Sequence, residues 1–197
     1  MNTNFYLEEN AFTKEECDHI IEKARPFLKP SLVVGDYDTD HFRNKKFRVS
    51  EEVHFHLIDD DPITLKLRNK IETISGFPKE NQESINVIHY TEGGYFLPHF
   101  DYFGHDGGED NLANQRLHTF ILYMNEDFIG GVTEFPKEEY KIIPKTGLLV
   151  GWNNVIEGTN ELNPYSLHGS TDIVSGEKWI VTIWVREQKA DNTLSDG

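Results

Sequence analysis

The spacing of apolar residues predicts two amphipathic helices in the N-terminal part of the chain. The first is expected to begin after Thr13, which can form a capping box with Glu16, and to end before Pro26; its apolar stripe is Cys17, Ile20, Ile21 and Ala24. The second is expected to begin after Asp61, an N-cap residue followed by proline, and to end at Gly76; its stripe is Ile63, Leu67, Ile71 and Ile74. The polar segment 33–46 between them is predicted to be a loop.

Beyond Gly76 the pattern changes to short runs that are rich in β-branched and aromatic residues. Gly, Pro, Asn and Asp separate these runs, and no helical spacing alternates with them. Such an order of elements predicts a sandwich, jelly roll or small barrel. The runs are SINVIHY, YFLPHFD, LHTFILYM, GVTEFP, KIIP, GLLVGW, YSLHG and KWIVTIWV, and the segment FRVSEEVHFHL before the second helix is also strand-like.

Length and composition describe an ordinary globular protein. The chain has 197 residues, of which 37% are hydrophobic and 27% charged, and this is enough for one domain with a substantial core. We expect a single domain over 1–197. It would consist of a helical part at about 1–80, a β core at about 84–187 and a polar tail at 188–197.

Charge and cysteine content narrow the class of protein. The net charge of -15 disfavours nucleic acid or an anionic membrane as the main partner. With Cys17 as its one cysteine, the chain can form neither an internal disulfide nor a thiolate zinc cluster. The first residues lack the features of a signal peptide, and no apolar run is long enough to span a bilayer. We therefore expect a cytoplasmic protein, whose oligomeric state the sequence does not indicate.

The segment YTEGGYFLPHFDYF places His99 and Asp101 two positions apart. In a strand these side chains share a face, where burying a carboxylate is unfavourable unless a cation compensates its charge. A metal ion would do so, and His168 in a second strand-like segment supplies a third ligand; two histidines and one carboxylate form the facial triad of non-haem Fe(II) sites. His54 and His56 have the same spacing, but their flanks lack the glycines and the downstream acid of a cupin metal site. We interpret them as ordinary sheet residues.

Five motifs resemble, in the same order, segments of the prolyl 4-hydroxylase family of Fe(II)- and 2-oxoglutarate-dependent dioxygenases. They are YTEGGYFLPHFDYF, RLHTFILYMN, GGVTEFP, IIPKTGLLVGWNN and LHGSTDIVSGEKWIVTIW, and the resemblance covers about residues 45–187. It implies an α+β, mostly β fold with a double-stranded β-helix (jelly-roll) core and the N-terminal helices packed outside. It also implies Fe(II), 2-oxoglutarate and O2 as cofactors and co-substrates, and it admits ascorbate as a further cofactor.

The resemblance assigns roles to particular residues of the site. His99, Asp101 and His168 fall on the iron ligands. Lys178 falls on the basic residue that binds the distal carboxylate of 2-oxoglutarate, a dianion for which a fixed cation is a suitable partner. Further positions of the co-substrate pocket match Tyr90, Tyr123 and Thr182.

On the substrate side, Arg48 and Ser50 resemble the family's Arg-Thr-Ser element and are implied to bind the substrate. Arg116 and Trp184 match positions that face the peptide cleft, and the resemblance implies that they take part in catalysis. The chain departs from the family pattern at three positions that carry no iron ligand: Phe96 in place of a tyrosine, Val132 in place of a glutamate and Arg186 in place of a histidine.

The sequence therefore predicts a dioxygenase that hydroxylates peptidyl proline and releases succinate and carbon dioxide. The departures at Phe96 and Arg186 leave open a second hypothesis, in which the substrate is a free amino acid or a small metabolite. A third is a jelly-roll binding module without activity, which would need neither the triad nor Lys178. The polar segment 104–115 is interpreted either as a lid over the site or as a plain surface loop.

Overall fold

The computed structural model describes residues 3–31, 48–56, 61–104 and 114–190. The predicted loop at 33–46 lies outside the described residues, as does most of the candidate lid at 104–115.

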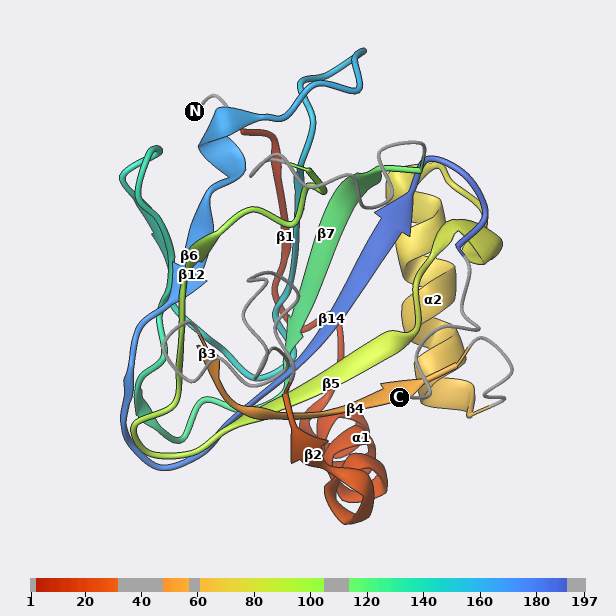
Figure 1. Cartoon of the computed structure of the whole chain (residues 1–197). Coiled ribbons are helices and arrows are strands. Elements are labelled where there is room, and N and C mark those ends of the chain that lie inside the picture. The colour runs from red at the N-terminus through yellow and green to blue at the C-terminus, as the bar shows by residue number, and fades with distance from the viewer. Residues whose placement is uncertain (1–2, 32–47, 57–60, 105–113, 191–197) are drawn as a thin grey trace, which may run out of the picture.

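Two antiparallel sheets face each other and form the core of the molecule (Figure 1). The larger sheet has the strand order β1-β11-β7-β14-β5-β4-β2: Phe5–Glu8, Leu149–Asn153, Arg116–Tyr123, Lys178–Arg186, Ile85–Tyr90, Glu51–Phe55 and Lys29–Pro30. The smaller sheet has the order β10-β9-β12-β6-β3: Tyr140–Ile142, Thr133–Phe135, His168–Ser170, Tyr95–His99 and Arg48–Val49. A separate ribbon pairs β8 (Ile129–Gly130) with β13 (Ile173–Ser175).

Both predicted helices are confirmed, as α1 (Lys14–Ala24) and α2 (Pro62–Ser75). Thr13 and Glu16 form the expected capping box, and the Asp61 side chain accepts hydrogen bonds from two backbone N–H groups in the first turn of α2. Gly76 ends α2 with a φ of 75°, a left-handed conformation that glycine adopts without strain. These caps satisfy backbone groups that a helix end leaves open, and so they fix where each helix begins or ends.

Strand β14 lies between two hydrophobic clusters because its side chains alternate between the two faces of the larger sheet. Trp179 and Val181 pack with the buried stripes of α1 and α2. Lys178, Ile180 and Thr182 point the other way and line a cleft between the sheets. The run KWIVTIWV looks continuously apolar because both faces of the strand are covered.

Figure 1 shows α1 and α2 on one side of the larger sheet, away from β6 and β12. Their buried residues join the cluster that contains the outer side chains of β5, β7 and β14. The inner side chains of the same strands pack against Phe135 and Ile142 of the smaller sheet. A mostly β jelly roll with helices packed outside is thereby confirmed.

Some elements differ from the sequence-based expectation. Strand β1 pairs with β11 at the edge of the larger sheet, but its four residues are too few to show a clear period. The run YSLHG divides into a short 3-10 helix, η3 (Pro164–Ser166), and the start of β12. Two other 3-10 helices are η1 (Arg25–Phe27) and η2 (Lys79–Asn81).

The first residues of the expected polar tail lie against the domain. Ala190 is buried, and its N–H donates to the carbonyl oxygen of Glu80 at 2.8 Å.

Within the described part of the chain, no helix has both the length and the apolar composition that crossing a membrane requires.

Candidate metal and co-substrate site

The pairing of β6 with β12 brings the two histidines of the predicted triad together. His99 ends β6, His168 begins β12, and the two residues are direct partners in the antiparallel register. Paired residues in antiparallel strands have their side chains on the same face of the sheet. Asp101 lies just beyond the end of β6, and all three side chains line the same cleft.

The three side chains are spaced as ligands around one centre. Their ligand atoms all lie within 4.8 Å of one another. The Nε2 atom of His99 is 3.6 Å from Oδ1 of Asp101, and that of His168 is 3.5 Å from Oδ2. These separations are long for hydrogen bonds, so the three groups do not satisfy one another fully.

Backbone carbonyl groups fix the orientation of both imidazoles. The Nδ1 atom of His99 lies 2.9 Å from the oxygen of Leu97, and that of His168 lies 2.9 Å from the oxygen of Ser166. Because a carbonyl can only accept, each Nδ1 carries a proton, and in the neutral form of the ring the lone pair lies on Nε2. Both Nε2 atoms are therefore available to a metal ion.

Burial and local charge set the ionisation states that a metal site needs. Desolvation lowers the pKa of His168 to about 4, so this imidazole is neutral at neutral pH. Burial acts to raise the pKa of Asp101, but its interactions with His168 and His99 outweigh this effect and hold the pKa below its ordinary value. The cleft thus presents an ionised carboxylate next to a neutral imidazole.

A chain of hydrogen bonds holds the carboxylate of Asp101. Thr119 donates through Oγ1 to Oδ2 of Asp101 at 2.7 Å, and Asn154 donates through Nδ2 to Oγ1 of Thr119 at 2.8 Å. Both supporting side chains are completely buried. Both lie in segments that resemble the family, but the sequence did not mark either as a site residue; the pairing of β7 with β11 brings them together.

This arrangement fits Fe(II). Two imidazoles and one carboxylate leave coordination positions open, as non-haem Fe(II) oxygenases require. Metal-ligating histidines and carboxylates are usually oriented by further hydrogen bonds, and the imidazoles and the carboxylate of this site have such partners. Among the described residues, His99, Asp101 and His168 form the one group of three ligating side chains with suitable spacing.

Lys178 is a buried cation in the same cleft. It is 1% exposed, and its ammonium group donates to the carbonyl oxygen of Gly131 at 2.7 Å and to Oγ of Ser170 at 2.9 Å. Both acceptors are uncharged, and burial lowers the pKa of Lys178 to about 7. A buried ammonium without a carboxylate partner among the described residues is stabilised when an anion enters the cleft. The site therefore fits the distal carboxylate of 2-oxoglutarate.

The Gly-Gly pair before Val132 allows the close contact to Lys178. Gly131 has a φ of 62°, and a Cβ atom there would lie 3.0 Å from Cδ of Lys178 and 2.6 Å from Cδ1 of Ile173. Only glycine fits this position without displacing its neighbours. Val132 itself bonds to Thr171 and does not line the cleft, so its departure from the family pattern lies outside the site.

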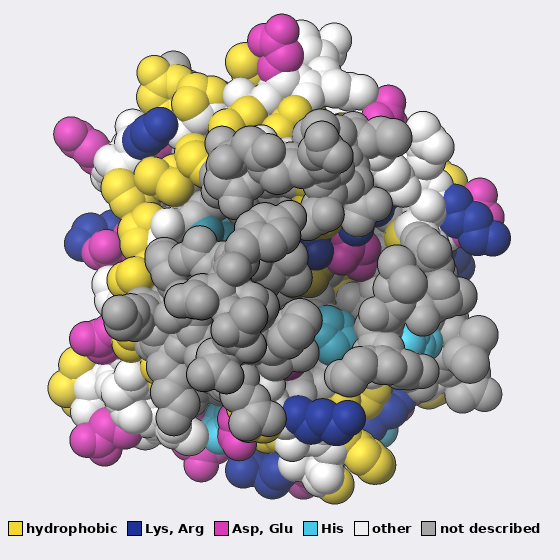
Figure 2. Space-filling model, viewed as in Figure 1, with side chains coloured by type: hydrophobic (Ala, Val, Ile, Leu, Met, Phe, Trp, Pro, Cys, Tyr) yellow, Lys and Arg dark blue, Asp and Glu magenta, His cyan; other side chains and the backbone are white. Residues whose placement is uncertain are grey.

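Four of the other predicted site residues also line the cleft: Arg48, Tyr90, Thr182 and Trp184. The apolar walls come from Ile88, Ile121 and Ile180 of the larger sheet. Figure 2 shows histidine, acidic and basic side chains gathered near the middle of the face it presents, between residues that are not described. The larger sheet thus supplies most of the walls around the triad.

Tyr123 lies behind the cleft wall. Its hydroxyl donates to Oγ1 of Thr133 at 2.7 Å, and Thr133 lines the cleft. The ammonium nitrogen of Lys178 lies 5.4 Å from the ring centroid of Tyr90 and 5.7 Å from that of Tyr123. The two tyrosines therefore flank Lys178, with Tyr90 as the one that faces the cleft.

The predicted substrate residues Arg48 and Ser50 occupy different environments. The Arg48 side chain is 7% exposed; its Nη2 lies 3.0 Å from Oε2 of Glu52, and its guanidinium lies over the ring of Phe96 at 4.9 Å. Ser50 donates to Oγ of Ser31 at 2.8 Å and does not line the cleft. Arg48 is thus part of the inner wall, and the structure does not bring Ser50 to the site.

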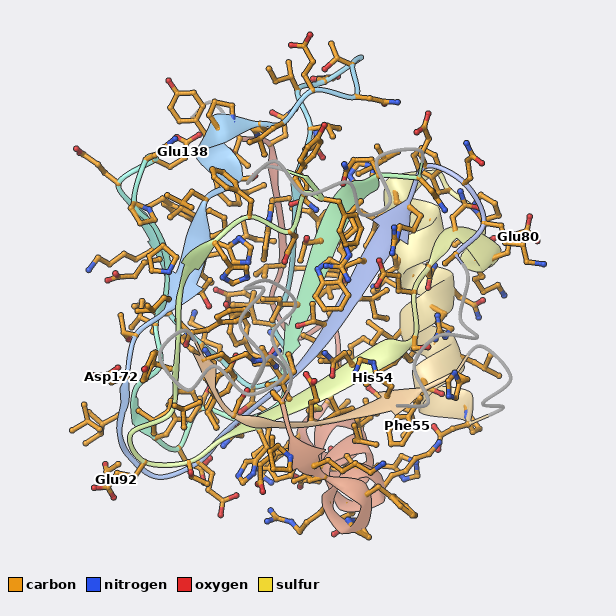
Figure 3. All side chains as sticks on the ribbon, in the orientation of Figure 1. His54, Phe55, Glu80, Glu92, Glu138 and Asp172 are labelled. Atoms are coloured by element: carbon orange, nitrogen blue, oxygen red, sulfur yellow. The ribbon has the colours of Figure 1, made fainter. Side chains whose placement is uncertain are left out.

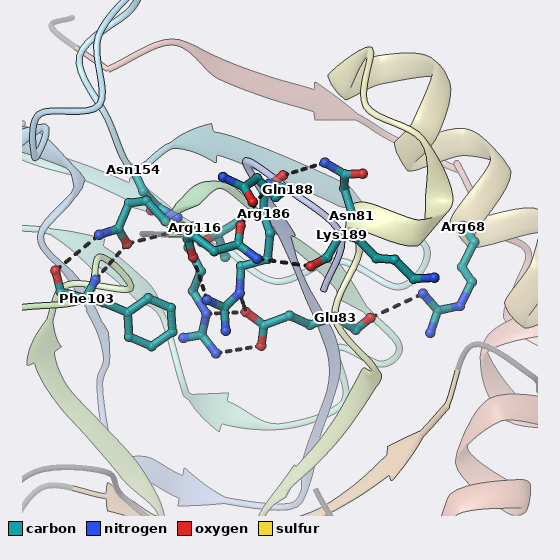
Figure 4. A network of polar contacts seen from close by, with 12 residues as sticks. Arg68, Asn81, Glu83, Phe103, Arg116, Asn154, Arg186, Gln188 and Lys189 are labelled. Carbon is teal, nitrogen blue, oxygen red and sulfur yellow. Dashed lines mark hydrogen bonds and ion pairs between the residues drawn. The ribbon is translucent and has the colours of Figure 1, made fainter. Parts of the chain in front are cut away.

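Glu83 binds Arg116 (Figure 4), and Arg116 in turn lies over the ring of Trp184. Nε and Nη2 of Arg116 each lie 2.7 Å from one carboxylate oxygen of Glu83, and the Arg116 Cζ atom lies 3.8 Å from the ring centroid of Trp184. Arg186 donates to the same carboxylate through its Nε. The sequence did not indicate Glu83, which follows η2 and belongs to none of the five motifs.

His54 and His56 are not among the residues that line the cleft. His54 and Phe55 lie on β4 beside α2, on the side of the molecule away from β6 and β12 (Figure 3). The Nε2 atom of His54 is 4.0 Å from Oε1 of Glu52, and Nδ1 of His56 is 3.4 Å from Oγ of Ser84. Neither histidine belongs to a group of metal-ligating side chains among the described residues.

Comparison with known proteins identifies the relatives of this chain. The sequence model of the 2OG-Fe(II) oxygenase superfamily, a protein family, matches residues 85–186 of this chain. Probable prolyl 4-hydroxylase 6 of Arabidopsis thaliana is 32% identical over 199 residues, which cover 91% of this chain and 68% of that protein. Probable prolyl 4-hydroxylase 7 of the same plant is 33% identical over 209 residues, which cover 96% of this chain and 65% of that protein. This chain thus spans about two thirds of the length of these relatives.

Solved structures agree with this relationship. The viral collagen prolyl hydroxylase of Paramecium Bursaria Chlorella virus-1, in a complex with 2-oxoglutarate, is 26% identical with a TM-score of 0.72, and the match covers 92% of this chain and 95% of that one. A prolyl-4-hydroxylase of Pseudomonas putida, 14% identical with a TM-score of 0.64, shares the fold over 93% of this chain and 92% of its own.

The fold, the triad and the superfamily match define an Fe(II)- and 2-oxoglutarate-dependent dioxygenase, which uses O2 as its oxidant. Within that class, the chain belongs to the prolyl 4-hydroxylase family, as its motifs predicted.

Removing the hydroxyl group of Thr119 is expected to weaken metal binding. Thr119→Val keeps the shape of the side chain but deletes the donor to Asp101, and such supporting groups are worth about 10–100-fold in metal affinity. We expect the Kd for Mn(II), an air-stable substitute for Fe(II), to rise by that factor in calorimetric titrations. Thr73→Val on the exposed face of α2 is the matched control and should leave the Kd unchanged. Wild-type affinity in Thr119→Val would contradict the assigned role.

Proposed function

We propose that this enzyme hydroxylates proline residues of polypeptides and converts 2-oxoglutarate to succinate and carbon dioxide. The observation that carries the proposal is the position of Lys178, a buried ammonium group without a carboxylate partner among the described residues, in the same cleft as the triad and Trp184. Relatives named prolyl 4-hydroxylases, and a viral relative named a collagen prolyl hydroxylase and solved with 2-oxoglutarate, support the choice of substrate.

In this proposal the residues of the triad hold the metal in a fixed orientation. Fe(II) bound there supplies the oxidising chemistry, in which one atom of O2 enters succinate and the other enters the substrate. His99 and His168 direct their Nε2 lone pairs into the cleft, and Asp101 is kept in place by Thr119. A site fixed in advance in this way needs no rearrangement when the substrate arrives.

Lys178 would bind the distal carboxylate of 2-oxoglutarate, next to Tyr90 and Thr182. Its ammonium group already makes two hydrogen bonds to uncharged acceptors, which hold it in place for the third. Tyr123 would act through Thr133, to which its hydroxyl donates. Apolar side chains form part of the walls between Lys178 and the triad, and exclusion of water by a bound co-substrate would strengthen the ion pair.

Trp184 would form the wall against which the proline ring lies. Proline presents a rigid ring with no N–H group, so a flat apolar surface suits it better than a hydrogen-bonding pocket. The indole N–H of Trp184 is enclosed and has no partner among the described residues. A carbonyl group of an extended peptide would supply the missing acceptor, since a buried donor left unpaired is unfavourable. Ser50 has no part in this arrangement.

Affinity for 2-oxoglutarate is expected to fall as the pH rises above about 7. In the free protein the pKa of Lys178 is lowered to about 7, and a bound carboxylate raises it, so binding takes up a proton above that pH. Below a pH of about 7, Lys178 is already charged in the free protein, so the Kd for 2-oxoglutarate no longer changes with pH. Above that pH, the Kd rises by up to about tenfold per pH unit. The measurement is a calorimetric titration of the Mn(II)-loaded protein between about pH 6 and pH 9.

Lys178→Met is the control for this pH dependence. The variant should bind 2-oxoglutarate weakly and with an affinity that does not change over the same range. A wild-type protein without the pH dependence, or a variant that keeps it, would show that another group anchors the co-substrate.

Proline-containing peptides are expected to stimulate succinate formation and to gain about 16 Da per hydroxylation, the mass of one oxygen atom. Trp184→Ala should lose this peptide-dependent succinate more than it loses the slow turnover of 2-oxoglutarate without peptide. Trp184→Phe, which keeps an aromatic wall, should retain part of it. Mass spectrometry measures the oxygen that the peptide gains, and parallel assays measure the succinate that is formed. Coupled hydroxylation of free L-proline, with none for any peptide, would favour the small-molecule substrate instead.

A further inference from the structure

Two arginines lie opposite each other beside the cleft, at the ends of β7 and β14. Arg116 and Arg186 are cross-strand partners in the antiparallel register. Like charges in such positions repel each other and destabilise a sheet. Both guanidinium groups bind the one carboxylate of Glu83, which reduces this repulsion (Figure 4). Burial acts to raise the pKa of Glu83, but the two arginines hold it below its ordinary value, so the carboxylate is ionised.

One positive charge of this group remains unbalanced among the described residues. Nη1 of Arg186 donates to the carbonyl oxygen of Asn114 at 2.7 Å, which is an uncharged acceptor. Asp101 also acts on Arg116, but its carboxylate faces the two histidines of the triad. Two guanidinium groups and one carboxylate therefore sum to a net charge of about +1, and the excess lies on the Arg116–Arg186 pair.

The pair is fixed in place and remains accessible. The Cζ atoms of Arg116 and Arg186 lie 4.6 and 4.4 Å from the ring centroid of Phe103, and Arg116 also lies over Trp184. The two arginine side chains keep 18% and 13% of their surface exposed, and neither has an enclosed nitrogen without a partner. A substrate group that reaches the outer edge of Trp184 thus meets donors that are already oriented.

We propose that Arg186 and Arg116 form a carboxylate-binding subsite, so that the enzyme prefers peptides with an acidic residue next to the target proline. A guanidinium group binds a carboxylate through charge-assisted, planar hydrogen bonds, and the subsite has one cation more than its own carboxylate requires. The inference rests on the proposed function, because it places the acidic side chain relative to a proline ring held by Trp184. The α-carboxylate of a free amino acid has the same chemistry and is distinguished by the test.

The test compares blocked peptides that are identical except for glutamate, glutamine or lysine beside the proline. The binding of fluorescent versions is measured by anisotropy on protein loaded with Fe(II) and 2-oxoglutarate without oxygen, and kcat/KM is measured separately with oxygen. We expect the glutamate peptide to have about tenfold higher affinity and about tenfold higher kcat/KM than the glutamine peptide. This is the order of one charge-assisted hydrogen bond at a partly exposed site. The lysine peptide should be the weakest, and added salt should reduce the differences.

Three variants assign the preference to Arg186. Arg186→Gln should bring the glutamate-to-glutamine ratio close to one, whereas Arg186→Lys, which keeps the charge, should retain a substantial part of it. Arg25→Gln removes the same charge at a side chain that is 55% exposed and contacts Glu177 and Trp179; it should keep the full ratio. Because the glutamate-to-glutamine ratio is measured within each variant, a general loss of activity does not change it.

The outcomes separate this inference from the proposed function. Equal binding of the three peptides by the wild-type protein, or an unchanged preference in Arg186→Gln, would overturn the subsite while hydroxylation itself stands. A charge preference in binding without hydroxylation of any peptide would support the subsite and overturn the proposed function. Stronger binding of free L-proline than of every blocked peptide, lost in Arg186→Gln, would overturn the assignment to an acidic side chain.

Discussion

A buried ammonium group that has no counterion in the part of the chain that the structure describes is the constraint on which the site depends. Lys178 lies on the central strand of the larger sheet, its described hydrogen bonds go to uncharged oxygens, and burial lowers its pKa to about 7. Such a group is unfavourable in the folded protein unless a ligand supplies the missing negative charge. The same feature that opposes stability therefore creates affinity for a dianion. This trade between stability and binding is common at functional sites.

The alternation of side chains along β14 explains how a cation can be placed there. One face of the strand packs Trp179 and Val181 against the helices, and this anchors the strand whatever lies on its other face. The other face is then free to carry Lys178, Thr182 and Trp184 along the cleft. The smaller sheet completes the site by pairing β6 with β12, which sets the two histidines opposite each other. In the proposed function, the larger sheet would thus hold the organic ligands and the smaller sheet the two imidazoles that bind the metal.

Features that depend on local patterns could be predicted from the sequence. The capping residues Thr13 and Asp61 fixed the beginnings of the helices, because a cap acts within one turn. The triad could be predicted because His99 and Asp101 share a face of one strand and His168 lies in a second strand-like segment, and the resemblance then placed all three on the iron ligands. The same resemblance assigned Lys178 and Trp184 to the site, and the structure places both side chains in the lining of the cleft.

Features that depend on pairing between distant strands could not be predicted. Thr119 and Asn154 support Asp101 only because β7 and β11 are neighbours, and no spacing along the chain signals this. Glu83 was overlooked for the same reason, although two arginines share its carboxylate. Ser50 is the converse case: its motif implied a substrate contact, whereas its hydroxyl donates to Ser31 and its side chain is not among those that line the cleft. The direction of a side chain at the edge of a strand is set by tertiary contacts, which a motif does not record.

The most direct test of the central claim is the free energy of unfolding of Lys178→Met, with and without 2-oxoglutarate. Urea unfolding of the Mn(II)-loaded proteins at a fixed pH near 7 gives both values. Without the co-substrate, the variant should be at least as stable as the wild type, because an unpaired buried charge has been removed. With 2-oxoglutarate at about a hundred times its Kd, the wild type should gain about 2.7 kcal/mol and the variant almost nothing. A variant that is clearly less stable without the co-substrate, or that gains as much from it as the wild type, would contradict the account.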